Sequence, residues 1–320
     1  MFKIGNLELK YPILLAPMAG ISDLPFRLMS RKFGCELAFV EMINVRSMSY
    51  KSKRTRQMLS SHPEDNPLGV QILGAEEKFI LKALDMLKEY RFDLLDFNAA
   101  CPVKKVIRRG EGASLLKDPK KLHKLLKLVV ANSHVPVTVK IRSGWDKDSV
   151  NAKAIALAAQ DAGVKAVIIH GRTKAQGYSG KVDYQAIREV KKSLEIPVVA
   201  SGDMFSAQLV KKMMDETGCD AVAIARGALG NPWIFRETQE YLKSGKIPDL
   251  PKKKEIVKVM VEHLDACIEF YGEAIGVMQF RKFFAWYTKG MRKVRPLRDK
   301  SSTAKTKDEM LGLIEGCGEG

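Results

Sequence analysis

Short apolar runs recur along the 320-residue chain, with longer amphipathic stretches between them. The runs are rich in Val, Ile, Leu and Phe and nearly continuous, which is typical of strands buried on both faces. The stretches between them place apolar residues at three- and four-residue spacing, which predicts helices. The predicted strands cover residues 13–17, 37–42, 68–72, 93–97, 137–141, 166–170, 197–201 and 220–225.

Strand and helix alternate through this part of the chain, which indicates a parallel sheet covered by helices. Eight strand-helix units favour a closed (β/α)8 TIM barrel, an α/β fold, over an open sheet. The clearest helical stretches cover residues 75–90, 118–133 and 148–163. Asp118 and Gly163 have the residue types expected of an N-cap and a C-cap.

The strand pattern stops after Pro248 and Pro251, and helical spacing follows at 252–271, 273–290 and 302–315. A segment with two prolines, KIPDLP, separates the two regions and reads as a linker. We therefore predict a catalytic barrel over residues 1–245 and a small all-helical domain over residues 246–320.

Polar residues follow the predicted strands at one end, which is where barrel enzymes keep their functional groups. The apolar run at 93–97 ends before Asn98 and Cys101, and Pro102 blocks a continued ladder, so the thiol is expected in a loop just past a strand. Arg142, His170 and Arg172 close the next two strands.

The loops after the last two predicted strands favour an anion site. Ser201, Gly202 and Asp203 follow one strand, and Ala225 and Arg226 end the other. Small residues let backbone N–H groups approach a phosphate, and an arginine adds a fixed positive partner. The bland alternative is that the glycines of these loops are turn residues only.

Lys140 lies inside an apolar run, where a lysine is rarely buried without a partner. It is a candidate Schiff-base nucleophile, a phosphate ligand, or a cation that stabilises a negatively charged cofactor ring. The alternative is a lysine whose ammonium reaches solvent at the barrel rim.

The formal net charge of +17 favours an anionic partner such as nucleic acid or a membrane surface. Five cysteines without a CxxC pair indicate neither a disulfide framework nor a zinc site. No apolar stretch reaches the roughly 18 residues of a spanning helix, and no signal sequence is recognised. We expect a soluble, cytoplasmic protein that needs no metal and does not bind membranes. GxGxxG after an early strand, GxxxxGK[ST] and HExxH are all missing.

Seven segments together resemble the FMN-dependent tRNA-dihydrouridine synthases, most closely the bacterial B-type branch. They span the whole barrel in the family's order: LAPMAGISDLPFR (15–27), VQILG (70–74), NAACPVKKV (98–106), VKIRSGW (139–145), HGRTKAQGYSG (170–180), SGDMFS (201–206) and ARGALGNPWIF (225–235). The helical end, through QFRKFFAWYTKGM (279–291), is similar to the family's RNA-binding domain more loosely. Ala100 and Ser201 depart from the family's usual Gly and Asn.

The resemblance implies an FMN pocket and a tRNA substrate. Cys101 would be the catalytic acid. The residues implied to bind the cofactor are Ala16, Pro17, Met18, Gln71, Lys140, His170, Ser201, Gly202, Asp203, Ala225 and Arg226. The residues expected to bind the substrate are Asn98, Lys104, Lys105, Arg142, Arg172, Arg281 and Lys282.

The reaction implied is reduction of a uracil C5=C6 bond in tRNA by FMN, which NADPH or NADH reduces first. Basic segments at 46–56 and 281–300 give the RNA an electrostatic surface, although most aromatic residues in the second segment are expected in a helical core. No oligomer is indicated. Two rivals stay open: an FMN enzyme of the dihydroorotate dehydrogenase type that acts on a free pyrimidine, and an RNA-binding protein that keeps a flavin barrel only as a scaffold.

Overall fold

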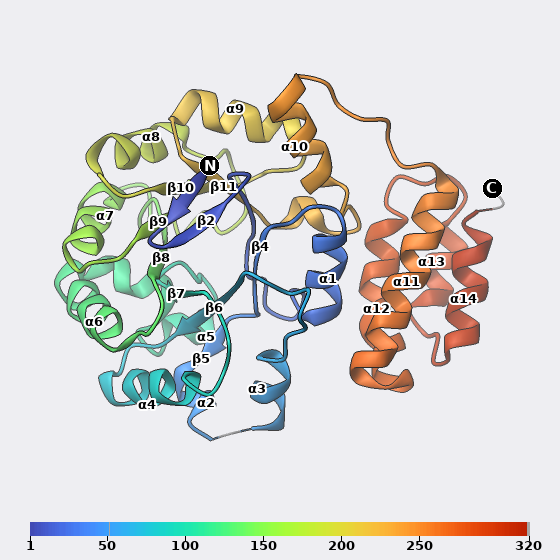
Figure 1. The fold of residues 1–320 in the computed structure, drawn as a ribbon, viewed down its shortest axis with the longest axis horizontal. Coiled ribbons are helices and arrows are strands. Elements are labelled where there is room, and N and C mark those ends of the chain that lie inside the picture. The colour runs from blue at the N-terminus through green and yellow to red at the C-terminus, as the bar shows by residue number, and fades with distance from the viewer. Residues whose placement is uncertain (51, 319–320) are drawn as a thin grey trace.

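The computed structural model describes residues 1–50 and 52–318. Within them, eight parallel strands close into a barrel, because β4 pairs with β3 on one side and with β6 on the other (Figure 1). The predicted (β/α)8 fold and all eight predicted strands are therefore confirmed. The strands are β3 (Ile13–Leu15), β4 (Leu37–Phe39), β6 (Leu68–Leu73), β7 (Leu94–Asn98), β8 (Val137–Arg142), β9 (Ala166–His170), β10 (Val198–Ser201) and β11 (Ala221–Ile224).

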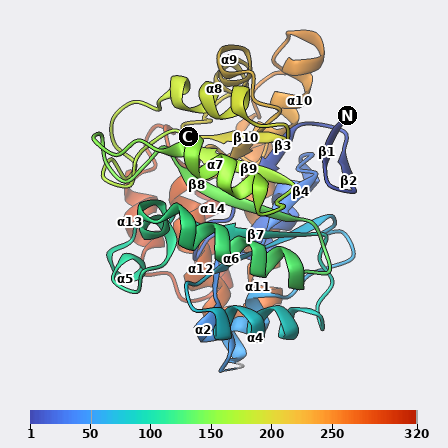
Figure 2. The ribbon, with the colours of Figure 1, turned by 90° about the vertical axis from the view of Figure 1, so that its left-hand side faces the viewer.

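Helices cover the outside of the barrel, as Figure 1 and the turned view in Figure 2 show. They are α1 (Leu24–Lys32), α4 (Glu77–Leu87), α6 (Pro119–Asn132), α7 (Ala152–Asp161), α8 (Tyr184–Ser193), α9 (Ala207–Thr217) and α10 (Ile234–Ser244). Shorter segments lie in the loops: α2 (Val45–Met48), α3 (Lys53–Met58), α5 (Lys104–Ile107), η1 (Gly112–Lys117) and η2 (Arg226–Ala228).

The two predicted caps have the expected roles. The Asp118 carboxylate accepts a hydrogen bond from the Lys121 N–H and so satisfies one free donor at the start of α6. Gly163 has a φ of +95° directly after the last residues of α7, a conformation that glycine adopts without a steric penalty. Local residue chemistry thus fixes where these helices begin and end.

An N-terminal hairpin that the apolar pattern did not predict fills the end of the barrel at which the strands begin. β1 (Phe2–Ile4) and β2 (Leu7–Leu9) pair antiparallel. Their buried side chains share one apolar cluster with the barrel interior, including Leu94 and Ala166. Three-residue strands carry too little alternation to be recognised from sequence.

The predicted strand at 37–42 is interrupted by a bulge. From Phe39 to Ile43 the chain advances four residues, whereas β6 advances three, from Gly69 to Ile72. The extra residue separates β4 from β5 (Ile43–Asn44), and both pair with β6. Bulges re-aim side chains at barrel rims, and this one contains Glu41 and Met42.

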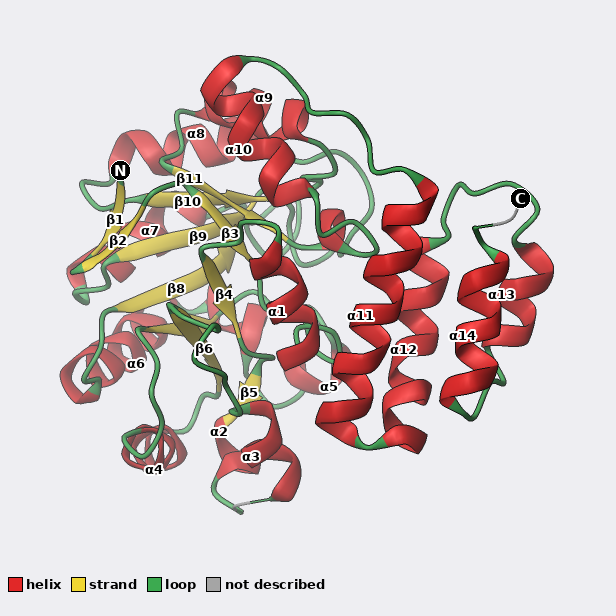
Figure 3. Ribbon diagram, turned by 45° about the vertical axis from the view of Figure 1, so that its right-hand side comes forward, coloured by secondary structure: helices red, strands yellow, loops and turns green. Residues whose placement is uncertain are grey.

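Four helices follow the barrel, and the first of them lies beside α1, as Figure 3 shows. They are α11 (Lys253–Tyr271), α12 (Glu273–Tyr287), α13 (Arg295–Ser301) and α14 (Lys307–Gly316). The sequence predicted α11, α12 and, as a helix at 302–315, α14, but it missed α13. Phe283, Phe284 and Tyr287 are buried, which confirms the core assignment of most aromatic residues there. The domain boundary at 245/246 stays a prediction.

No described helix is both long and apolar enough to cross a membrane. Across residues 1–50 and 52–318, no group of three or more His, Cys, Asp or Glu side chains is placed to hold a metal ion.

A buried ion-pair cluster ties α1 to the segment before β6. The Asp65 carboxylate accepts hydrogen bonds from Arg27 Nε and Arg31 Nε, both at 2.8 Å. Its side chain is 0% exposed, and the two arginine side chains are 1% and 8% exposed. Arg31 also donates to the carbonyl oxygens of Glu36 and Pro67, directly before β4 and β6.

We expect Asp65→Ala to lower the free energy of unfolding by about 3–5 kcal/mol, because two buried guanidinium groups lose their partner. Denaturant titration would measure this. The exposed pair Lys211–Asp215 supplies the control, since Asp215→Ala should cost less than about 1 kcal/mol. Equal effects of the two substitutions would contradict a structural role for the cluster.

Candidate active site

A cavity of about 410 Å³ opens at the carboxyl ends of the barrel strands. Every residue predicted to contact the cofactor lines it, as do Asn98, Cys101 and Arg142. Arg172, Lys104, Lys105, Arg281 and Lys282 do not line it. The strand ends thus gather most of the expected site at one mouth, while the roles of these residues stay predictions.

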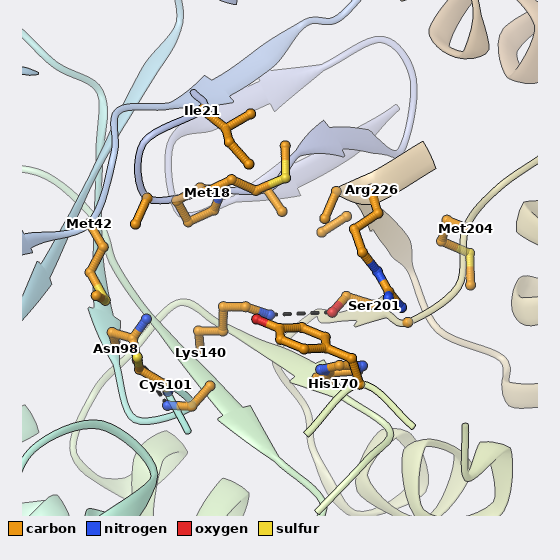
Figure 4. Close-up of a pocket in the computed structure, with 18 of the residues that line it drawn as sticks. Met18, Ile21, Met42, Asn98, Cys101, Lys140, His170, Ser201, Met204 and Arg226 are labelled. Atoms are coloured by element: carbon orange, nitrogen blue, oxygen red, sulfur yellow. Dashed lines mark hydrogen bonds between the residues drawn. The ribbon is translucent and has the colours of Figure 1, made fainter. Parts of the chain in front are cut away.

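The strand order places the thiol and the expected anion site on opposite sides of this mouth. The ring of strands runs β7, β8, β9, β10, β11, so the loop with Cys101 and the loop with Arg226 are four strands apart in a ring of eight. Figure 4 shows Cys101 and Asn98 at one end of the pocket, Arg226 at the other, and Lys140 and Ser201 between them.

A chain of hydrogen bonds begins at the fully buried Asp96. Its carboxylate accepts from the Thr138 hydroxyl at 2.6 Å and from Gln71 Nε2 at 2.7 Å. Gln71 Oε1 accepts from Asn98 Nδ2 at 2.9 Å. Asn98 Oδ1 in turn accepts the backbone N–H of Cys101 at 2.9 Å.

The direction of this chain is set by its first member. Burial raises the pKa of Asp96 to about 6, so the carboxyl is ionised at neutral pH and only accepts. Gln71 must therefore turn its NH₂ toward Asp96, and Asn98 must turn its carbonyl toward the Cys101 loop. One N–H of Gln71 and one of Asn98 remain to donate elsewhere, and both side chains line the cavity.

Cys101 has a free thiol that is 9% exposed and lies in the loop after β7, as predicted. Burial raises its pKa, and this outweighs the opposing effect of Arg142. Lys104 and Lys105, which follow the thiol in the sequence, are exposed on α5. The thiol therefore stays protonated at neutral pH.

Gly112 permits a close approach to the Cys101 loop, a role that the sequence did not reveal. It has a φ of +58°, and an added Cβ would lie 2.8 Å from the Cys101 carbonyl oxygen. The Ala113 N–H donates to that same oxygen at 3.1 Å. A larger residue at position 112 would push the thiol loop away.

Burial lowers the pKa of both Lys140 and His170. Burial lowers the pKa of Lys140 to about 8, and its ammonium donates to the Ser201 hydroxyl at 3.3 Å. Burial and the positive charges nearby, Lys140 first, hold the pKa of His170 far below its usual value, so the imidazole is neutral. His170 Nε2 is buried without a hydrogen-bond partner in the described structure.

Two arginines meet one carboxylate at the other end of the cavity. Asp203 pairs with Arg172 and with Arg226, and the hydrogen bond from Arg172 is the main reason why the pKa of Asp203 is lowered. The Arg226 side chain remains 40% exposed. An added Cβ at Gly227 would lie 1.9 Å from the Met204 carbonyl oxygen, so glycine is needed for these loops to approach.

Several predicted substrate-binding groups already have protein partners. Arg142 donates to the carbonyl oxygens of Ala100, Thr173 and Gly177. Arg172 also donates to the carbonyl oxygens of Ser179 and Gly180. On α12, Arg281 donates to the carbonyl oxygen of Ala304, and Lys282 donates to that of Gly20.

Tyr178 is a lining residue that the sequence reasoning did not single out. It lies in the loop after β9 and is 61% exposed. The Arg142 and Arg226 guanidinium carbons lie 5.6 Å and 5.1 Å from its ring centre. An aromatic residue between glycine-rich turns in that loop was the available signal.

The barrel fold recurs in solved structures of low sequence identity. A histamine dehydrogenase from Rhizobium sp. 4-9 superposes with a TM-score of 0.59 at 12% identity, covering 83% of this chain and 50% of its own. The BexX/CysO complex of Amycolatopsis orientalis gives a TM-score of 0.50 at 18% identity, covering 78% of this chain and 98% of its own. These similarities concern the fold alone.

Sequence similarity is much higher to named enzymes. The tRNA-dihydrouridine synthase B of Pasteurella multocida is 38% identical over 314 residues, covering 98% of this chain and 95% of its own length. A probable tRNA-dihydrouridine synthase of Rickettsia conorii is 37% identical over 292 residues, covering 91% and 88%. The dihydrouridine synthase (Dus) family model matches residues 14–317. The chain therefore belongs to the dihydrouridine synthase family.

Proposed function

We propose that this protein is a tRNA-dihydrouridine synthase that reduces the C5=C6 bond of specific uridines in tRNA, using FMN and NADPH or NADH. One observation carries the proposal: a chain of this family places a protonated thiol and a cationic loop end on opposite sides of one cavity. As tRNA is the substrate, the place of action is the cytoplasm.

The cavity suits a flavin. Its volume of about 410 Å³ lies within the range of roughly 300–1,000 Å³ of ligand sites. The partnerless Nε2 of the buried His170 needs a hydrogen-bond partner that a ligand would provide. Arg226, with the tight backbone at Gly227, is proposed to hold the phosphate, and Gln71 and Lys140 the polar edge of the ring.

When bound, FMN reduced by NAD(P)H would be the source of the hydride for uracil C6. The chain's own task is the proton. We assign to Cys101 the donation of its thiol proton to C5, so that two C–H bonds replace the C5=C6 π bond. The resulting thiolate regains its proton from water. The raised pKa of the thiol keeps that proton in place until the base arrives.

The target base must leave the tRNA stack to reach this cavity. Basic residues around the mouth would bind the phosphates. Lys104 and Lys105 are exposed beside the Cys101 loop. The predicted basic segment 46–56 provides Arg46, Lys53, Arg54 and Arg56, all exposed, whereas Lys51 lies outside the described residues.

Neither rival reading is favoured by the family match. A dihydroorotate dehydrogenase-type enzyme would oxidise or reduce a free pyrimidine without RNA. A scaffold-only protein would bind tRNA but would not pass electrons to it. Reoxidation of the reduced flavin by tRNA lacking dihydrouridine, in the absence of oxygen, separates both rivals from the proposal.

We expect Cys101→Ala to lower the rate of tRNA reduction about 10²- to 10⁴-fold, the usual size of a general-acid contribution, while FMN remains bound. Single-turnover reduction of unmodified tRNA by the prereduced enzyme measures the rate. Cys219→Ala is a suitable control because that cysteine is also buried but does not line the cavity. Unchanged tRNA reduction by Cys101→Ala would disprove the acid assignment.

We expect Asp96→Asn to weaken FMN binding about tenfold, because an amide can donate as well as accept and no longer orients Gln71. Flavin fluorescence titration of the apoprotein measures the affinity. Thr138→Val removes a hydrogen bond to Asp96 but keeps the acceptor-only carboxylate, so its effect should be smaller. Wild-type affinity in Asp96→Asn would refute the role of the hydrogen-bond chain.

We expect FMN affinity to fall as pH rises from 7 to 9. Lys140 loses its charge above a pKa of about 8, and bound FMN, being anionic, shifts that loss upward. The cation's contribution is thus present at pH 7 and fades with rising pH. Lys140→Met should bind FMN more weakly at pH 7 and with little dependence on pH, whereas Lys140→Arg should keep its affinity at pH 9. The same fall with pH in Lys140→Met would rule Lys140 out as its source.

A further inference from the structure

The turn between β3 and α1, residues 18–23, forms one wall of the cavity through Met18 and Ile21. The turn is tight: the Ser22 hydroxyl accepts the Met18 N–H at 3.0 Å, and the Met18 carbonyl oxygen accepts the N–H of Ile21 at 3.0 Å. Gly20 at its tip has a φ of +72°, which favours glycine.

Two charged side chains hold the tip from opposite sides. The Gly20 N–H donates to the Glu41 carboxylate, which comes from the bulge after β4 and is 8% exposed. The Gly20 carbonyl oxygen accepts from the Lys282 ammonium of α12 at 2.5 Å. The peptide groups of one residue are thus shared between the barrel and the C-terminal helices.

A second contact from these helices lies at the end of the same turn. The Tyr271 hydroxyl, on α11, donates to Asp23 Oδ2 at 3.0 Å, while Asp23 Oδ1 accepts the Phe26 N–H and caps α1. Asp23 is 4% exposed, so its carboxylate depends on these donors for compensation.

Apolar side chains pack beside the two polar contacts, between α1 and the helices α11 and α12. Phe26 of α1 stacks on Phe283 of α12 with ring centres 5.5 Å apart and planes 17° apart. His263 of α11 packs against Phe283 at 4.3 Å. Figure 3 shows α1 lying directly beside α11. This packing leaves Lys282 and Tyr271 little freedom to move away from the turn.

We propose that Lys282 and Tyr271 are positioning residues, through which the C-terminal helices hold the 18–23 turn as a wall of the cofactor pocket. This role replaces the predicted phosphate contact for Lys282, and it rests on the proposed function in so far as the pocket holds FMN. The C-terminal helices, which the family resemblance implies to bind RNA, would then also shape the cavity and so couple the two binding events.

Four variants test the proposal: Lys282→Met, Lys282→Arg, Tyr271→Phe, and Lys289→Met as a control. Lys289 is exposed just past the end of α12, so its substitution removes the same charge without touching the turn. Tyr271→Phe deletes one hydroxyl and keeps the ring packing. Circular dichroism would verify that each variant folds.

We expect Lys282→Met to weaken FMN binding to the RNA-free protein about tenfold, since it removes a hydrogen bond from a charged group, and Tyr271→Phe to weaken it less. Lys282→Arg should restore part of the affinity because a guanidinium can still donate to Gly20. The salt dependence of tRNA binding should be the same for Lys282→Met and wild type.

Amide hydrogen exchange supplies a reading that needs neither flavin nor tRNA. Exchange in a peptide covering residues 16–26 should rise in Lys282→Met and Tyr271→Phe and stay unchanged in Lys289→Met. A protein that shows this pattern but fails to reduce tRNA would contradict the proposed function and leave the positioning role standing. Unchanged exchange in both variants would overturn the positioning role. So would an intact FMN affinity in Lys282→Met together with a slope of log tRNA affinity against log salt concentration that is smaller by about one, since that is the result of a lost phosphate contact.

Discussion

The closure of the barrel between β3, β4 and β6 is the constraint on which the site depends. Strand pairing is short at this seam: in β4, Ala38 and Phe39 pair with Leu68 and Gly69 of β6, and the Val40 N–H just past β4 donates to the Gly69 carbonyl oxygen. The ring of Phe39 occupies the space where Gly69 would carry a Cβ, so glycine leaves room for this ring in the barrel. Arg31 fastens the seam from outside by binding the carbonyl oxygens that precede both strands. Closure brings every strand's carboxyl end to one mouth.

Desolvation at that mouth shifts the pKa values of two groups in opposite directions. It raises the pKa of the Cys101 thiol, which favours the neutral acid, and lowers the pKa of Lys140, which weakens the cation. The buried Asp96 carboxylate offsets the second effect, because it raises the pKa of Lys140. One carboxylate therefore orients Gln71 and also helps keep its lysine neighbour charged.

Strands and most site residues were predictable because each signal is local. An apolar run identifies a strand, and the residue at or just past its end, such as Ser201 or Asn98, is placed at the mouth by topology alone. The N-terminal hairpin and the bulge before Ile43 were not predictable, since three-residue strands and one-residue register shifts leave no periodic trace. The partners of Lys282 were also hidden: its acceptor is a backbone carbonyl 262 residues away, and any residue type provides one.

The hairpin that fills the lower end of the barrel has a consequence for the order of events. Phe2, Ile4 and Leu9 pack into the interior from that side, whereas the residues that line the described cavity lie at the strand ends on the side of Cys101. In the proposed reaction, the nicotinamide donor and the transfer RNA would both reach the flavin from this side, one after the other. The prosthetic group then stores the electrons between the two binding events, and the nicotinamide donor and the tRNA are not bound at the same time. This is the kinetic pattern called ping-pong.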